Sequence, residues 1–302
     1  MQPQNCGFTQ LGVRQVMLKN SSVIKYRKLV QVHVDHGRLS VSRYMSKIPD
    51  RNRRAGLVSV IIPALESRAD LLASQCLPSI ESQTYRPFEV IVVSESFSTS
   101  IADAVRKMGG SYRYFWGTKK SRALRKAGSF ANWCSGAAPN LNLAIKKARG
   151  EYIARIDDDD EWLPGHLSKA VALLEEGAFE FVSSAAHDPD GAIVENSNLS
   201  DYKYFGHDFE WLNLSSVIGP TITWVYRRHL RIFKFNVNSW KKKINRPAHY
   251  DFMFRIAAAG VSIAYSPTVS ARYRSRPGTG GLTGHRAYML DAGEVSPGES
   301  QT

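Results

Sequence analysis

The chain of 302 residues is 43% hydrophobic and 22% charged, has a formal net charge of +13, and contains three widely spaced cysteines, Cys6, Cys76 and Cys134. These proportions are typical of a globular protein, and the cysteines argue against a disulfide scaffold or a zinc site and favour reduced thiols in a cytoplasm-like compartment. No apolar run reaches about 20 residues and the amino terminus lacks the pattern of a signal peptide, so we expect a cytoplasmic protein, soluble or peripheral at the inner membrane face.

The first 56 residues carry most of the positive charge. They hold eleven Lys or Arg and two Asp, a balance of +9 within the total of +13. Such a segment can contact an anionic membrane or an acidic polymer, or it can be a solvated extension; nucleic acid is not the expected partner. Residues 28–34 and 38–42, around Asp35-His36-Gly37, predict a short hairpin. The polar run 50–56 predicts a linker, and residues 1–50 should be dispensable for the main domain.

Strands and helices alternate from residue 57 onward. Continuous apolar runs at 57–63 and 88–93 predict two buried parallel strands, and residues 112–115 predict a third. Apolar side chains at helical spacing predict helices over about 69–83, bent by Pro78, and over 101–108.

The alternation continues to about residue 181. Residues 119–136 are polar and basic and suggest a loop, whereas Pro139 begins a helix that stops at Gly150. A strand follows at 150–156, and another helix is predicted over 166–176. Repeated strand–helix units predict an α/β fold with a mostly parallel central sheet and helices on both faces.

The pattern changes after Phe181. A turn at 188–191 joins two short strands, and the region 202–240 is aromatic-rich and irregular. A helix is expected over 250–259 and a last strand over 261–265. Residues 276–302 are rich in Gly, Pro, Ser and Thr and predict a flexible tail, so we expect an extension at 1–56, a main domain at 57–275 and a tail at 276–302.

Four consecutive carboxylates, Asp157 to Asp160, follow the apolar strand at 150–156. Adjacent carboxylates repel one another, and a bound cation relieves that repulsion. Oxygen ligands suit Mg²⁺ or Mn²⁺ better than zinc. A solvated acidic turn is the alternative, but the preceding buried strand and the following Trp162 favour a binding site at the strand end.

Several ordered segments resemble the family 2 glycosyltransferases, which are nucleotide-sugar enzymes of the GT-A fold. The similarity is good over 57–185 and loose over 215–275, and it implies a nucleotide-sugar half at 57–185 and a smaller, irregular acceptor half at 186–275. The segments are VSVIIP at 58–63, CLPSIESQ at 76–83, FEVIVV at 88–93, NLNLAI at 140–145 and ARGEYIARIDDDD at 148–160.

The resemblance also implies roles for single residues. Asp157, Asp158 and Asp159 occupy the family's Asp-x-Asp motif, so Asp159 is the first choice as metal ligand, and Asp157 is expected at the metal and the nucleoside. Pro63, Glu95 and Asn142 join Asp157 and Asp158 as donor-binding residues. Two departures leave the nucleobase open, because Ser94-Glu95 replaces the usual Asp-Asp pair and Leu65-Glu66 replaces Tyr-Asn.

The catalytic base is expected in the segment 248–255. Aligned through Arg255, the family's catalytic Asp falls on His249, and Asp251 takes the next acidic position. Either side chain is a competent base, and both can instead be ordinary residues at the start of a helix.

The resemblance implies a metal-dependent, inverting glycosyltransferase of polysaccharide or cell-envelope biosynthesis. It would move a sugar from a nucleotide diphosphate donor to a hydroxyl of a glycan, lipid-linked or small-molecule acceptor, with Mn²⁺ or Mg²⁺ as cofactor. The alternative is a catalytically impaired, glycosyltransferase-like module that binds an anionic surface or polymer, which the His at position 249 favours. A nucleotidyltransferase is a third, weaker alternative.

Overall fold

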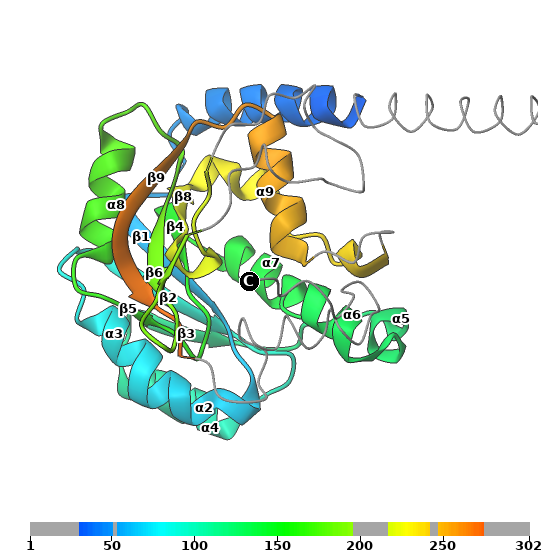
Figure 1. The fold of residues 1–302 in the computed structure, drawn as a ribbon, viewed down its shortest axis with the longest axis vertical. Helices are drawn as coiled ribbons and strands as arrows, with labels where there is room; N and C mark the ends of the chain where they lie inside the picture. The colour runs from blue at the N-terminus through cyan, green and yellow to red at the C-terminus, as the bar shows by residue number, and fades with distance from the viewer. Residues whose placement is uncertain (1–29, 51–52, 196–216, 242–246, 275–302) are drawn as a thin grey trace, which may run out of the picture.

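The computed structural model of the protein describes residues 30–50, 53–195, 217–241 and 247–274. Its frame is a nine-stranded sheet in the order β3-β2-β1-β4-β8-β6-β9-β5, with β7 paired to β6 (Figure 1). The strands are β1 (Arg54–Pro63), β2 (Phe88–Val93), β3 (Tyr112–Phe115), β4 (Gly150–Arg155), β5 (Glu161–Trp162), β6 (Phe181–His187), β7 (Ile193–Val194), β8 (Val225–Arg227) and β9 (Ile263–Arg272).

The first half of the sheet is parallel. Strand β1 pairs in parallel with β2, where Val58 lies opposite Phe88, and with β4, where Val58 lies opposite Tyr152. Strand β2 pairs in parallel with β3. The first residue of β4 is Gly150. A larger residue does not fit there, because its Cβ atom would overlap the backbone of Leu57 and Ser59. The parallel strands expected from the apolar runs are confirmed, and they carry the carboxyl ends of β1 and β4 to one edge of the sheet.

The second half of the sheet is mixed rather than parallel. Strand β8 lies between β4 and β6 and is antiparallel to both, and β5 is antiparallel to β9. Only β6 and β9 are parallel there. The expectation of a mostly parallel sheet therefore holds for β3-β2-β1-β4. It fails beyond β4, where antiparallel pairs predominate.

Helices cover both faces of the sheet (Figure 1). One apolar cluster joins the sheet to α2, α3, α4 and α8, and a second joins it to α7, α9 and the helix over residues 30–46. The helices in the described residues are α2 (Ala69–Leu71), η2 (Leu72–Cys76), α3 (Leu77–Glu81), α4 (Thr99–Lys107), α5 (Arg122–Lys126), α6 (Gly128–Ser135), α7 (Ala138–Lys147), α8 (His166–Glu175) and α9 (Ala248–Ala258), with short 3₁₀ turns η1 (Glu66–Arg68), η5 (Thr221–Thr223), η6 (Arg228–Ile232) and η7 (Ser239–Lys241).

Two local predictions are corrected by the structure. The segment 119–136 is not a loop, because it contains α5 and α6, and the Ser121 hydroxyl caps the first of them by accepting from the Leu124 N–H at 3.1 Å. The predicted bend at Pro78 takes another form. The chain winds as a π-helix at Leu72–Cys76, and Pro78 lies in the first turn of α3, where a missing N–H is tolerated.

The predicted hairpin between residues 28 and 42 is wrong. Residues 30–46 form a helix that packs against the domain, with Leu39 fully buried in the second apolar cluster. His36 Nδ1 lies 3.0 Å from the Ala259 carbonyl oxygen at the end of α9, and the Arg43 guanidinium forms an ion pair with Glu180. This part of the expected extension is therefore an integral helix of the fold.

Some expectations concern residues outside the described ranges. These are residues 1–29 of the basic extension, the first part (202–216) of the aromatic-rich segment, and the tail at 276–302. Within the described part of the chain, none of the helices combines the length and apolar character needed to cross a lipid bilayer.

Candidate active site

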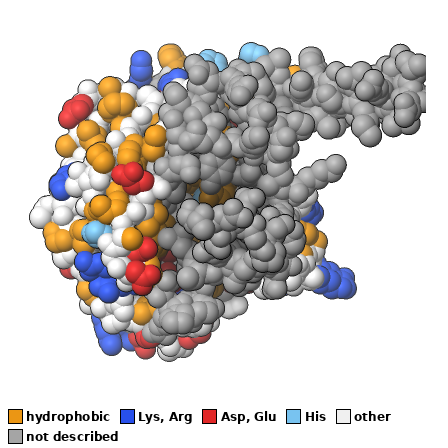
Figure 2. Space-filling model, in the orientation of Figure 1, with side chains coloured by type: hydrophobic (Ala, Val, Ile, Leu, Met, Phe, Trp, Pro, Cys, Tyr) orange, Lys and Arg blue, Asp and Glu red, His pale blue; other side chains and the backbone are white. Residues whose placement is uncertain are grey.

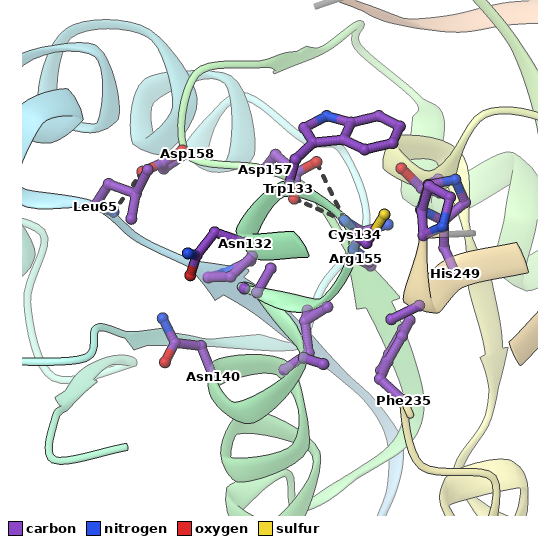
Figure 3. Close-up of a pocket in the computed structure, with 18 of the residues that line it drawn as sticks. Leu65, Asn132, Trp133, Cys134, Asn140, Arg155, Asp157, Asp158, Phe235 and His249 are labelled. Atoms are coloured by element: carbon purple, nitrogen blue, oxygen red, sulfur yellow. Dashed lines mark hydrogen bonds and ion pairs between the residues drawn. The ribbon is translucent and has the colours of Figure 1, made fainter. Parts of the chain in front are cut away.

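A cleft of about 630 Å³ lies at the carboxyl edge of β1 and β4. Its floor is formed by the ends of these strands, and its walls by α6, the first turn of α7 and the first turn of α9 (Figure 3). Polar side chains from several segments line the cleft. Those that are charged or carry an amide or imidazole are Arg68, Glu95, Lys120, Asn132, Asn140, Arg155, Asp157, Asp158 and His249.

The four consecutive carboxylates have different surroundings. Asp157 lines the cleft and accepts from Arg155 Nη2 at 2.9 and 3.2 Å. Asp158 accepts from the Leu65 N–H at 2.7 Å and is paired with Arg68 at 3.2 Å. Asp159 lies 2.9 Å from Arg68 Nη1 and is not among the residues that line the cleft. The structure thus places Asp157 and Asp158 in the cleft and Asp159 immediately behind it.

Asp160 is directed away from the cleft. Its Oδ1 atom accepts from the Arg274 N–H at 3.1 Å, just beyond β9. Burial, together with the neighbouring Asp159 and Asp157, raises its pKa well above the ordinary value. Asp160 therefore connects the acidic turn to β9 rather than serving the cleft.

Burial also raises the pKa of Asp158, to about 7. The Arg68 guanidinium and the Leu65 N–H oppose this rise, while Asp159 and Asp157 add to it. Arg68 itself has a raised pKa, because the attraction of Asp159 and Asp158 outweighs the effect of its burial. The turn thus gathers four carboxyl groups against the two guanidinium groups of Arg68 and Arg155, so full ionisation of all four is opposed.

Arg155 is the last residue of β4 and is buried beneath the cleft. Its guanidinium lies 5.9 Å from the ring centroids of both Trp224 and Phe235. One nitrogen pairs with Asp157, whereas Nε and Nη1 have no hydrogen-bond partner among the described residues. A buried guanidinium with free donors at the wall of a cleft can bind an anionic group of a ligand.

The structure separates the two candidate bases. His249 lines the cleft at the start of α9, and its ring packs beside Tyr250. Asp251 is buried outside the cleft lining, where its carboxylate accepts from Arg255 Nε at 2.8 Å and from Asn236 Nδ2 at 3.3 Å. Asp251 therefore has the contacts of a residue that anchors α9, and His249 is the one that faces the cleft.

The predicted donor-binding residues are also divided. Pro63 and Glu95 line the cleft, and Glu95 is paired with Lys120 at 3.1 Å. Asn142 does not line it, because its side-chain amide bonds the backbone N–H and carbonyl of Phe235, each at 2.9 Å. Asn140, two residues earlier in α7, occupies the cleft instead.

The cleft contains functional candidates that the sequence did not reveal. Arg68 and Arg155 are the cations that contact the acidic turn. Asn132 and Trp133 belong to α6, which was expected to be a loop. The spacing of Ser121 and Leu124 is a helix-start signal that would have indicated α5, while the role of Arg155 depends on contacts that no local pattern encodes.

The acidic turn fits a divalent cation supported by a bound diphosphate. No group of three His, Cys, Asp or Glu side chains suited to a metal occurs in the described part of the chain. Mg²⁺ sites of nucleotide enzymes commonly use one or two carboxylates and complete their coordination with water and substrate phosphates. The carboxylate oxygens of Asp157, Asp158 and Asp159 match that requirement.

Comparisons with known proteins were made for the sequence and for the fold. The sequence model described as "Glycosyl transferase family 2" matches residues 59–233. The UDP-Glc:alpha-D-GlcNAc-diphosphoundecaprenol beta-1,3-glucosyltransferase WfaP of Escherichia coli is 33% identical over 119 residues, which are 39% of this chain and 41% of that protein. The GalNAc(5)-diNAcBac-PP-undecaprenol beta-1,3-glucosyltransferase of Campylobacter jejuni is 28% identical over 123 residues, 40% of this chain and 35% of that protein. The matches thus span less than half the length of these relatives.

Two solved structures share the fold at low sequence identity. The mannosyltransferase PcManGT from Pyrobaculum calidifontis, in complex with GDP-Man and Mn²⁺, gives a TM-score of 0.50 at 18% identity and covers 89% of this chain and 75% of that one. Residues 1–349 of S. aureus TarS, in complex with UDP-GlcNAc, give a TM-score of 0.50 at 18% identity, with 81% and 68% covered. The expected GT-A-like fold is confirmed by this similarity.

Proposed function

Because the chain belongs to glycosyl transferase family 2, we propose that it transfers a sugar from a nucleotide diphosphate donor to a hydroxyl group of a lipid-linked glycan. The names of the Escherichia coli and Campylobacter jejuni relatives specify undecaprenol-linked acceptors, and the former specifies UDP-Glc as donor. Such acceptors favour action at the cytoplasmic face of the membrane. The single observation that carries the proposal is the cleft in which Asp157, Asp158 and Arg155 meet within the matched region.

The donor diphosphate would lie against the acidic turn and Arg155. Asp157, which faces the cleft, and Asp159 behind it would hold Mg²⁺ or Mn²⁺, which neutralises the negative charge that develops on the leaving diphosphate. Arg68 keeps Asp158 and Asp159 in place by its ion pairs. The buried Nε and Nη1 donors of Arg155, which have no partner among the described residues, would bind a phosphate oxygen while its remaining nitrogen orients Asp157.

The acceptor hydroxyl would approach from the side of α9. An alcohol is a poor nucleophile until a base accepts its proton, and a neutral imidazole is suited to this task near neutral pH. His249 is the candidate base that lines the cleft. Attack on the anomeric carbon opposite the leaving diphosphate would invert its configuration in a single displacement.

The acidic turn can be tested by replacing Asp157 with Asn. The change removes one negative charge at the cleft and leaves Arg155 an oxygen to contact, so we expect transfer to fall by about 10²–10³-fold and cation-dependent nucleotide binding to weaken. Transfer would be measured with a panel of UDP- and GDP-sugars and an undecaprenol-linked acceptor, and binding by calorimetry with Mn²⁺. Asp103→Asn, in the exposed part of α4, is the matched control.

The outcomes distinguish the enzyme from its alternative. Unchanged transfer by Asp157→Asn would remove the acidic turn from the mechanism. Nucleotide binding by the unmodified protein without product from any donor would favour a binding module that has lost its activity.

The base can be tested by comparing His249→Gln with Asp251→Asn. We expect His249→Gln to lower kcat by about 10²–10⁴-fold with donor binding unchanged, because only proton transfer is lost. Asp251→Asn should instead lower the melting temperature, because it weakens a buried ion pair with Arg255. Full activity of His249→Gln would place the base elsewhere.

A further inference from the structure

The helix over residues 30–46 has an exposed apolar face, which we call the apolar stripe. Successive helical residues turn by about 100°, so the stripe side chains fall within a sector of roughly 100°, and Leu39 points in the opposite direction. Their exposed fractions lie between 43% and 69%, whereas Leu39 is fully buried. Figure 1 shows this helix along the outer edge of the molecule. The stripe consists of Val30, Val34, Val41, Tyr44, Met45 and, just beyond the helix, Ile48.

A basic hollow of about 510 Å³ adjoins the end of the stripe and shares Met45 and Ile48 with it. Its charged lining consists of Arg43, Lys47, Arg53, Arg227, Arg228 and Arg231 against Asp50, Glu151 and Glu180, with His229 beside them. Each acid is paired with one arginine: Glu180 with Arg43, Glu151 with Arg227 at 4.0 Å, and Asp50 with Arg228 at 3.4 Å.

Three cations of the hollow remain uncompensated. Within the described ranges, no carboxylate lies at ion-pair distance from Lys47, Arg53 or Arg231. The Arg53 guanidinium donates to the Ser46 carbonyl oxygen, which carries no full charge. The hollow therefore has an excess of positive charge that a bound anion would balance.

Arg228 lies at the centre of this excess. Its side chain is 9% exposed, and its Nε atom has no hydrogen-bond partner among the described residues. Burial lowers its pKa, and the neighbouring Arg231 and Arg53 lower it further. A buried donor crowded by like charges is the arrangement expected where an anionic oxygen binds.

We propose that the apolar stripe and the basic hollow form one docking face for an anionic phospholipid membrane. The stripe side chains would enter the boundary between headgroups and acyl chains, as those of interfacial helices do. Lys47, Arg53, Arg228 and Arg231 would contact lipid phosphates, to which basic side chains at a membrane surface are attracted. The occupant follows from charge complementarity, because only a surface that is both anionic and apolar satisfies the hollow and the stripe together.

The docking face lies at the opposite edge of the sheet from the cleft. Glu151, near the start of β4, lines the hollow, and Asp157, just after the end of β4, lines the cleft. Docking would therefore leave the cleft open to donor and acceptor. The inference goes beyond the transfer reaction, and either can fail without the other.

The test is flotation of the full chain with phosphatidylcholine vesicles, with and without phosphatidylglycerol. We expect binding to the anionic vesicles only, and weaker binding at higher salt. Lys47→Glu/Arg231→Glu should weaken it by at least 25-fold, from about fivefold for each basic side chain removed. Val41→Glu/Tyr44→Glu should weaken it by at least about tenfold, because two exposed apolar side chains no longer enter the lipid.

Two matched variants serve as controls. Ile193→Glu changes an apolar side chain that is 61% exposed on β7, close to the 63% of Val41. Lys107→Glu reverses an exposed charge at the end of α4. Both should float like the unmodified protein, and all four variants should keep its melting temperature because the altered side chains are exposed or line an open hollow.

Several results would overturn the proposal. These are no flotation of the unmodified protein, equal flotation with neutral vesicles, or unchanged flotation of both double variants. Binding of inorganic pyrophosphate that needs Lys47 and Arg231, without vesicle binding, would identify a soluble anion as the occupant. A dimer in light scattering that Val41→Glu/Tyr44→Glu dissociates, without flotation, would make the stripe a contact between two copies of the chain.

Discussion

Asp157, Asp158, Asp159 and Asp160 are neighbours in sequence, yet each carboxylate is held by a different partner. Arg155 holds the first in the cleft, and the Leu65 N–H fixes the second. Arg68 contacts the third, and the Arg274 N–H contacts the fourth. Asp157 and Asp158 line the cleft, while Arg68 ties Asp158 and Asp159 to η1 and the Arg274 N–H ties Asp160 to the end of β9.

The raised pKa values of Asp158 and Asp160 predict that stability falls as pH rises. Asp158, with a pKa of about 7 in place of 3.8, stays protonated in the folded state at pH 5 but is ionised in the unfolded chain. At pH 8 it is ionised in both states, so the folded state bears the cost of a buried charge. The loss of stability accumulates between about pH 4 and pH 7.

Asp160→Asn should reduce this pH dependence. The amide oxygen can still accept from the Arg274 N–H, and no buried charge forms at high pH. We expect a melting temperature several degrees higher than that of the unmodified protein at pH 8, at roughly 2–4 °C per kcal/mol, and a smaller difference at pH 5. Thermal denaturation without divalent cations measures this, with Asp103→Asn as control. Equal melting temperatures of Asp160→Asn and the unmodified protein at both pH values would show that burial does not disfavour ionisation of Asp160.

The donor-binding residues show what a sequence can and cannot predict at this scale. The Asp-rich motif indicated the chemistry, and Asp157 does face the cleft. Asn142 was selected by its place in a segment similar to the family, but Asn140 lines the cleft. Side chains two positions apart on a helix point in directions about 200° apart, so only one of the two can face the cleft. Which of the two faces the cleft depends on how α7 packs against the loop at Phe235, which is remote in sequence.

Among the elements, the helix over residues 30–46 depends most on tertiary contacts. Valines at alternate positions and the Asp35-His36-Gly37 segment suggest a hairpin, because valine favours strands and glycine favours turns. Only Leu39 and Asp35 are buried along this helix, and the valines at 30, 34 and 41 are exposed. Packing of Leu39 therefore outweighs the local preference, including the cost of about 1 kcal/mol for Gly37.

Leu39→Ala should destabilise the whole domain. The side chain is fully buried in the second apolar cluster, so its truncation should cost about 2–5 kcal/mol in the free energy of unfolding. Urea denaturation measures this, with the exposed Val41→Ala as control. Deletion of residues 1–50 should likewise impair folding, which reverses the expectation from the sequence that this segment is dispensable. A change below about 0.5 kcal/mol for Leu39→Ala would show that the helix is not part of the core.

The parallel strands were predictable, whereas the mixed half of the sheet was not. β2, β3 and β4 are rich in apolar and aromatic residues, and their bounds agree with the sequence prediction to within a residue. β8 is three residues long and gains its place only by pairing with β4 and β6. Pairing between strands so distant in sequence leaves no local pattern to detect.

In the molecule as a whole, the cleft and the basic hollow lie at opposite edges of the sheet and differ in charge. Negative charge gathers in the turn at the carboxyl edge, and uncompensated positive charge gathers in the hollow at the amino edge. The basic character of the first 56 residues is therefore partly the property of a folded surface. Arg43, Lys47 and Arg53 contribute to it together with arginines of β8 and η6 that come much later in the chain.

Strand β4 connects the two edges and is held in place on both sides, because it pairs with β1 over most of its length and with β8 at residues 152–154. Six residues at about 3.3 Å each give it a length of about 20 Å. A molecule standing on lipid by its amino edge would therefore carry out its chemistry at a fixed height above the bilayer. The acceptor hydroxyl would then have to extend from its lipid anchor by about the length of β4.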